Sequence, residues 1–270
     1  MNDYTALSIG WGFSLTLSAQ MGYLISGSHM NPAVSFFLSM FGKISKLQFI
    51  LYCIVQTAGA FLGSFLVFIL YYDSIMVFSN GSLAVTGPTA TAGMFATYPN
   101  EHLSFMGSII DQILSTMVLV ICICIICDER NKIPRIAQPT LLGFMLTLIQ
   151  FSMAWNASNS MNPARDFGPR LMTLVVGYGW EVFSYRNYSW FLVPIICPFI
   201  GAFIGAWIYL LTIGVNISDD VDEISRPLTL PVYHSNNYPL QHIPIKIEGY
   251  NHQMNPIGPM HPRLTSYKSH

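Results

Sequence analysis

The chain has 270 residues, of which only 9% are charged and 52% are hydrophobic, and its formal net charge is −1. Soluble domains carry about 25% charged residues, so the composition excludes an ordinary soluble domain and favours a protein that crosses a membrane several times. The small net charge and the lack of basic runs argue against nucleic acid as a partner.

Seven apolar runs follow one another along the chain, and they fall into two length classes. Five are near the roughly 20 residues that a helix needs to cross a bilayer, whereas the other two are too short to cross and are typical of re-entrant half-helices. We therefore predict an all-α membrane protein with five full spans at 5–25, 47–71, 107–127, 137–154 and 190–213, and half-helices at 32–41 and 163–175.

Lys and Arg predict the orientation of these spans. They occur at 43–46, at 130–135 and in the tail 215–270, but the long connection 72–105 contains none. Because cytoplasmic segments are enriched in Lys and Arg, we expect residue 1 and the connection 72–105 outside and the tail in the cytoplasm. The tail is rich in Pro, His and Asn, a composition that predicts disorder.

Two further features concern modification and metal binding. Asn80 and Asn187 each begin an Asn-X-Ser sequence on the predicted outer side, so both are candidate glycosylation sites. Cys124 and Cys127 have a CxxC spacing without a second pair, which favours packing among apolar residues over metal binding. We expect no metal and no cofactor.

The two halves of the chain repeat the same order of features. Met30-Asn31-Pro32-Ala33 and Met161-Asn162-Pro163-Ala164 each precede a short apolar run, and each half later contains a Gly-Ala-Phe-X-Gly sequence, at 59–63 and 201–205. An odd number of spans separates the halves, so their topologies are inverted, as in proteins that build a solute site near the bilayer midplane. The Gly-Ala-Phe-X-Gly pairs are interpreted as helix-packing faces.

Asn followed by Pro has a local mechanism at the head of a short helix. Asn is a strong N-cap and Pro suits the first helical position, so each half-helix should begin at Asn31 or Asn162. Two such N-termini meeting at the midplane disfavour cations, protons included. The preceding backbone cannot be helical, and its carbonyl groups should line a water-filled path: Gly27, Ser28, His29, Ser158 and Ser160.

These motifs resemble those of the aquaporin family, most closely its aquaglyceroporin branch. The resemblance runs from Trp11 to Gly214 and is carried by the sequence from Ser26 to Val34, by the sequence from Met161 to Leu171, and by outer-loop matches such as Phe95-Ala96-Thr97-Tyr98-Pro99. It implies an aquaporin-like channel domain at 1–214, a homotetramer in membrane lipid with one pore per subunit, and passive, non-enzymatic passage of glycerol, water and urea. The plasma membrane is the expected location.

The resemblance also implies a narrow filter built from four side chains. Trp11 and Arg165 match the aromatic and arginine positions, and an arginine inside a membrane indicates function. Ungapped spacing puts Gln150 and Asn159 at the other two positions, where the branch usually has a small residue and an aromatic residue. The predicted filter is therefore more polar than usual. For Trp11, an interface-belt aromatic remains the alternative.

Two expectations concern the support of the pore loops, the segments 26–30 and 156–161 that precede the two half-helices. The family places an acid in the span that corresponds to 107–127, where it supports the backbone of the second loop, and this role is assigned to Asp111. The family has six spans, so the first family span, with its own acid, is expected to be missing here, which predicts a truncated product with weak conductance. A non-conducting membrane subunit and a secondary transporter, which would need a coupling-ion site, remain the alternatives.

Overall fold

A computed structural model describes residues 4–217 of the chain. Within these residues the regular structure is helical, and nearly all of the predicted tail lies outside them. The helices are α1 Tyr4–Ser26, α2 Pro32–Met40, α3 Lys46–Leu70, α4 Tyr72–Phe78, α5 Phe105–Cys127, α6 Gln138–Met153, α7 Pro163–Thr173, α8 Glu181–Ser184 and α9 Val193–Ile208, with short 3₁₀ or π turns at Ala92–Met94, Glu129–Asn131, Leu174–Tyr178, Tyr209–Ile213 and Gly214–Asn216.

The predicted spans correspond to α1, α3, α5, α6 and α9. Three helices among the described residues are long and apolar enough to cross a membrane: α3, α5 and the continuous helix Val193–Asn216. Helix α6 has only 16 residues, and α1 has 23 residues but contains more polar side chains. The long connection 72–105 begins with the short helix α4.

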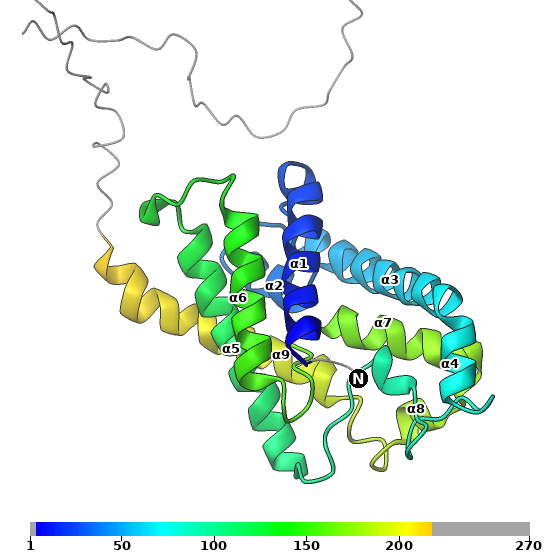
Figure 1. The fold of residues 1–270 in the computed structure, drawn as a ribbon. Coiled ribbons are helices and arrows are strands. Elements are labelled where there is room, and N and C mark those ends of the chain that lie inside the picture. The colour runs from blue at the N-terminus through cyan, green and yellow to red at the C-terminus, as the bar shows by residue number, and fades with distance from the viewer. Residues whose placement is uncertain (1–3, 218–270) are drawn as a thin grey trace, which may run out of the picture. The chain divides into compact units, whose positions relative to one another are not determined.

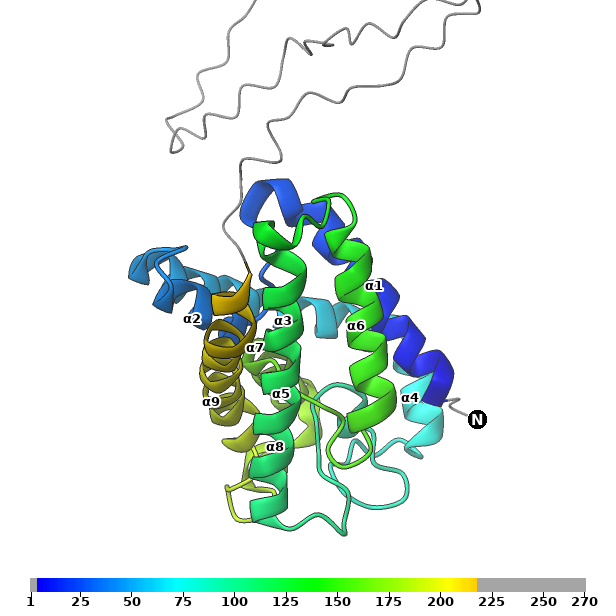
Figure 2. The same ribbon diagram turned by 90° about the vertical axis from the view of Figure 1, so that its left-hand side faces the viewer.

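The helices α1 and α6 pack against each other in opposite directions (Figures 1 and 2). The Tyr4 hydroxyl, at the start of α1, donates to the carbonyl of Gln150 near the end of α6 at 2.7 Å. At the crossing, a Cβ atom placed on Gly12 would lie 2.6 Å from the Gly143 carbonyl oxygen, and one on Gly143 would lie 2.5 Å from that of Gly12. Only glycine permits this backbone approach.

The two short helices each pack against the last long helix of the other half: α7 against α3, and α2 against α9. Gly168 of α7 makes its contact possible, since a Cβ atom there would lie 2.6 Å from the carbonyl oxygen of Thr57 in α3. This crossed arrangement brings the N-terminal ends of α2 and α7 into contact with each other, between the long helices α3 and α9.

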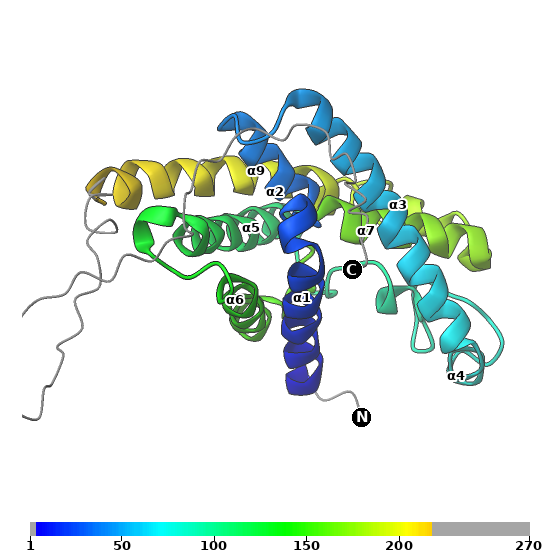
Figure 3. The same cartoon turned by 90° about the horizontal axis from the view of Figure 1, so that it is seen from above.

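The Gly-Ala-Phe-X-Gly faces of α3 and α9 have different surroundings. In α9, Gly201 and Gly205 are buried against α5, and a Cβ atom on Gly205 would lie 2.5 Å from the Met117 carbonyl oxygen. In α3, Gly59 and Gly63 are exposed, and a Cβ atom on either has no described atom within 4 Å. Figure 3 shows α5 beside α9, whereas the helices that α3 packs against most extensively are α7 and α2.

Candidate functional site

Both half-helices begin at the predicted Asn. The Asn31 side chain accepts from the backbone N–H of Ala33 at 2.9 Å, and Asn162 accepts from Ala164 at 3.1 Å and Arg165 at 3.2 Å. Each Asn has extended backbone angles and is followed by Pro at the first helical position. The local prediction from the Asn-Pro pairs is therefore confirmed.

The two N-caps also hold the two pore loops together. The side-chain amide of Asn31 donates to the carbonyl of Met161 at 2.8 Å, and that of Asn162 donates to the carbonyl of Met30 at 2.8 Å. Each amide group has two hydrogens, so one remains on each Asn for a further acceptor. The arrangement places two half-helix N-termini and two amide donors at one point.

The loops before the half-helices have the same unusual backbone. Ser28 and Met30 have φ of 48°, while Asn159 and Met161 have φ of 43° and 49°. These residues occupy matching positions in the two repeats, and the left-handed region is costly for residues other than glycine. This conformation persists because the surrounding contacts hold it. The predicted path-lining carbonyls of Gly27, Ser28, His29, Ser158 and Ser160 accept no hydrogen bond from residues 4–217.

The second pore loop is supported by Gln112, the residue next to the predicted Asp111. Gln112, which is fully buried, accepts from the backbone N–H of Ser160 at 3.0 Å and of Met161 at 3.4 Å. Asp111 was expected to make this contact, but it accepts instead from the Asn156 side chain at 2.9 Å and from the Gln112 amide at 3.0 Å. Successive residues of a helix point in different directions, and residue 112 is the one on the face toward the loop.

The first loop lacks the equivalent support among the described residues. The backbone N–H groups of His29 and Met30, which correspond to those of Ser160 and Met161, donate to no atom of residues 4–217. The loop is held instead by the hydroxyl of Ser28, which donates to the carbonyl of Ala19 at 2.8 Å.

The predicted aromatic and arginine of the filter lie together. The guanidinium carbon of Arg165 lies 4.9 Å from the centre of the Trp11 ring, within the range of a cation–π interaction. The Arg165 Nη1 atom donates to the carbonyl oxygen of Phe95 at 3.0 Å. Phe95 belongs to the connection between α4 and α5, so this connection folds back onto the predicted filter.

The two polar filter candidates lie near each other at the end of α6. The Asn159 side chain donates to the carbonyl of Ile149, the residue before Gln150, at 3.1 Å. The oxygen of the Asn159 side chain is buried without a hydrogen-bond partner among residues 4–217, and the residue is 1% exposed. Gln150 is also buried, and its side chain makes no hydrogen bond within the described part of the chain.

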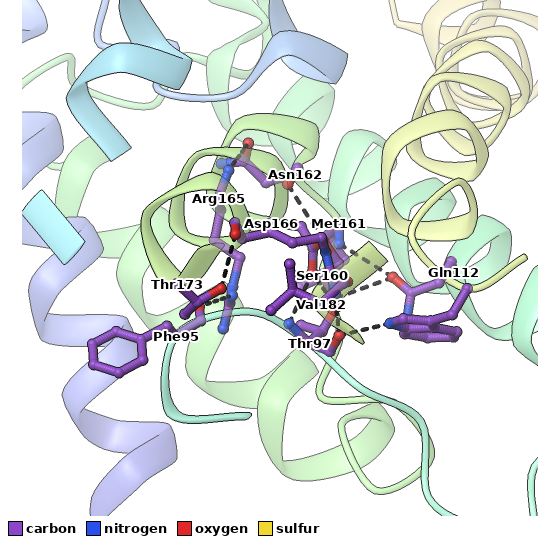
Figure 4. Close-up of polar contacts among 12 residues, drawn as sticks. Phe95, Thr97, Gln112, Ser160, Met161, Asn162, Arg165, Asp166, Thr173 and Val182 are labelled. Atoms are coloured by element: carbon purple, nitrogen blue, oxygen red, sulfur yellow. Dashed lines mark hydrogen bonds and ion pairs between the residues drawn. The ribbon is translucent and has the colours of Figure 1, made fainter. Parts of the chain in front are cut away.

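Asp166 and Arg170, to which the sequence pattern assigned no role, form a buried ion pair beside the filter (Figure 4). Asp166 and Arg170 are both fully buried, and Arg170 Nε donates to Asp166 at 2.9 Å. The other carboxylate oxygen of Asp166 accepts from the backbone N–H of Thr97 at 2.9 Å and from its hydroxyl. Arg170 donates in turn to the Thr97 carbonyl at 2.7 Å. The four-residue spacing of the two charges on a helix was the signal available in the sequence.

Comparisons with known proteins agree with this geometry. The family model described as "Major intrinsic protein" matches residues 1–209. Aquaporin-9 of Mus musculus is 39% identical over 219 residues, which cover 81% of this chain and 74% of that protein. Aquaporin-10 of Homo sapiens is 36% identical over 215 residues, which cover 79% of this chain and 71% of that protein.

The fold has a counterpart among solved structures. The X-ray structure of the aquaglyceroporin from Plasmodium falciparum has a TM-score of 0.71 and 26% sequence identity, and the match covers 80% of this chain and 86% of that one. The family match, the relatives and the two crossed half-helices lead to the same conclusion. The chain belongs to the major intrinsic protein family, whose members named here are aquaporins.

Proposed function

We propose that this membrane protein is a passive channel for water and glycerol, with urea as a further permeant. The observation that carries the proposal is the reciprocal pair of hydrogen bonds from Asn31 to Met161 and from Asn162 to Met30. It leaves two amide donors and two half-helix N-termini for a solute oxygen. The same positive ends disfavour protons and other cations.

We assign the filter to Trp11, Gln150, Asn159 and Arg165. The contact of Arg165 with Trp11 supports the first and last of these positions. A guanidinium donor beside an aromatic wall suits a solute that has hydroxyl groups on one side and carbon atoms on the other. The buried acceptor of Asn159 adds a preference for solutes with O–H or N–H donors, because an unpaired buried oxygen is costly.

The similarity to aquaporins and to an aquaglyceroporin supports passive conduction over the two alternatives, a secondary transporter and a non-conducting subunit. We further propose a homotetramer in the plasma membrane with the tail 215–270 in the cytoplasm. The distribution of Lys and Arg supports this orientation.

The test is the osmotic response of vesicles that contain the purified chain. We expect water and glycerol permeability above that of protein-free vesicles, linear in the gradient and independent of Na⁺ and proton gradients. The matched variant is Asn162→Asp, which keeps the N-cap acceptor but replaces the amide donor by a negative charge. It should reduce glycerol flux about tenfold and admit cations. A saturable or ion-coupled flux, or no flux above protein-free vesicles, would contradict the proposal.

A further inference from the structure

We propose that Asp166 and Arg170 are positioning residues for the filter: they hold the segment 95–97 so that the Phe95 carbonyl fixes the Arg165 guanidinium. This inference rests on the proposed channel function, which it extends by adding a second set of residues that decides solute selectivity. Neither charge of the pair touches a permeating solute.

The first step is that Asp166 does not pair with its neighbour Arg165. Both carboxylate oxygens of Asp166 are used elsewhere, one by Arg170 and the other by the backbone and side chain of Thr97. The guanidinium of Arg165 donates instead to the carbonyl of Phe95. The direction of that guanidinium therefore depends on where the Phe95 carbonyl lies.

The second step is that Thr97 is fixed at each of its polar groups. Asp166 accepts from its N–H and hydroxyl groups, and its carbonyl accepts from Arg170 at 2.7 Å and from the Trp190 ring nitrogen at 2.6 Å. Arg170 is itself anchored, because its third nitrogen donates to the carbonyl of Val182 at 2.9 Å. Figure 4 includes Thr97, Asp166 and Val182 among the residues drawn, with the hydrogen bonds dashed.

The third step is that Phe95, two residues away, cannot move independently. Its ring is buried between the rings of Phe68 and Tyr178, at centroid distances of 6.1 and 6.4 Å, and Tyr178 is hydrogen-bonded to Thr91 at 2.7 Å. The apolar contacts hold the side chain of Phe95, and the ion pair holds the backbone that follows it. Together they leave one position for the Phe95 carbonyl.

Stability does not explain this pair. Two fully buried charges lose their hydration, and an apolar pair of similar volume is often as stable or more stable. What a satisfied buried pair provides here is geometry: the fork of Arg170 matches both the Asp166 carboxylate and the Thr97 carbonyl. The pair thus links α7, which carries Arg165, to the outer connection, which carries its acceptor.

The test uses the full chain in vesicles and compares the double variant Asp166→Leu/Arg170→Met with the wild type. Removing both charges avoids an unpaired buried charge, and only neutral groups, in Thr97 and Val182, lose a partner. We expect its ratio of glycerol to water permeability to change about two- to tenfold, the factor that corresponds to one hydrogen bond. The ratio does not depend on how many channels fold, so a loss of folded protein leaves it unchanged.

The matched control is Arg186→Met. Arg186 anchors the same outer connection, but farther along, by donating to the carbonyls of Leu103 at 2.7 Å and Asn100 at 3.3 Å. Its loss should leave the permeability ratio at the wild-type value. The conservative variant Arg170→Lys keeps the charge but loses the fork, and its ratio should lie between those of the wild type and the double variant.

A second measurement applies whether or not the chain conducts. Modification of Arg165 by phenylglyoxal, followed by mass spectrometry, reports how firmly its guanidinium is held. We expect faster modification in the double variant and the wild-type rate in Arg186→Met. An unchanged rate overturns the positioning role, and a faster rate with an unchanged permeability ratio overturns its effect on selectivity. A wild type without flux contradicts the channel function alone, and the rate then decides the positioning role.

Discussion

Single side chains of this channel carry roles that neighbouring residues in the sequence do not share. Gln112 and Asp111 are adjacent on α5, yet only Gln112 accepts from the backbone of the second pore loop. Asp111 acts one step away, on the side chains of Gln112 and Asn156. The difference follows from the turn of about 100° between successive residues of a helix.

The first prediction separates these two residues. Gln112→Leu leaves two buried N–H groups unpaired and should lower the free energy of unfolding in detergent by about 1–3 kcal/mol. Gln112→Glu keeps the acceptor but places a buried carboxylate against Asp111, which accepts from the Gln112 amide at 3.0 Å, so it should also lower the stability. Asp111→Asn should cost less than Gln112→Leu. Equal losses for Gln112→Leu and Asp111→Asn would show that Asp111 carries the support after all.

The second prediction concerns Asn159. Asn159→Leu removes a side-chain oxygen that has no partner in the described part of the chain and a nitrogen that donates to the carbonyl of Ile149. These two effects oppose each other, but Leu tolerates the φ of 43° at this position less well than Asn, so we expect the free energy of unfolding to fall by about 1–2 kcal/mol. Urea permeability should fall more than glycerol permeability in vesicles, since urea has four N–H donors that could use the Asn159 oxygen as an acceptor and glycerol has three O–H donors. An unchanged urea-to-glycerol ratio would remove Asn159 from the proposed filter.

At the scale of helices, equivalent glycines of the two repeats have unequal surroundings. Gly201 of α9 is buried against α5, whereas Gly59 of α3 is exposed and has no described atom near its missing Cβ. The backbone N–H groups of His29 and Met30, in the loop beside α3, are likewise without partners in residues 4–217. Gly59 and these N–H groups both belong to the first half of the chain, and their equivalents in the second half are buried or paired.

The third prediction uses this pair of glycines as each other's control. Gly201→Ala forces a methyl group against the backbone of α5 and should lower the free energy of unfolding by about 1–3 kcal/mol. Gly59→Ala meets no described atom and should raise it by about 0.5–1 kcal/mol, because Ala is the better helix former. Thermal unfolding in detergent measures both. A comparable loss for Gly59→Ala would mean that another helix covers this face of α3.

For the molecule as a whole, charge outside the helices predicts its orientation. The segment from Asp128 to Arg135 carries three cations, and the Arg130 guanidinium holds the pKa of the Asp128 carboxyl well below its usual range. Asn80 follows α4 and Asn187 follows α8, and both are exposed. The segments that contain them are joined by a hydrogen bond from the Thr86 hydroxyl to the Glu181 carboxylate at 2.9 Å.

The fourth prediction tests this orientation on intact cells. A membrane-impermeant maleimide should label Asn187→Cys from outside, because its segment lies on the side poor in Lys and Arg. Lys43→Cys should react only after the cells are opened, and the unsubstituted chain corrects for its native cysteines. Labelling of Lys43→Cys on intact cells would reverse the proposed orientation.

The sequence alone determined the elements that depend on local chemistry. Two Asn-Pro pairs before short apolar runs sufficed to predict both half-helices and their caps, because N-capping involves only residues within one turn. Hydropathy located the long helices for a similar reason, since each must bury its own backbone hydrogen bonds. The contact of Trp11 with Arg165 followed from motif spacing within the family pattern.

Only the tertiary structure decided the contacts between segments far apart in the chain. Gly12 and Gly143 are separated in the sequence by the same number of residues as Asn31 and Asn162, but no local pattern predicts that the two glycines contact each other. The choice of Gln112 over Asp111 depended on the rotation of α5, which packing against α9 sets. The link from Asp166 and Arg170 through Thr97 to Phe95 and Arg165 joins a half-helix to a distant loop, and the energy of a buried ion pair depends on partners that only folding brings together.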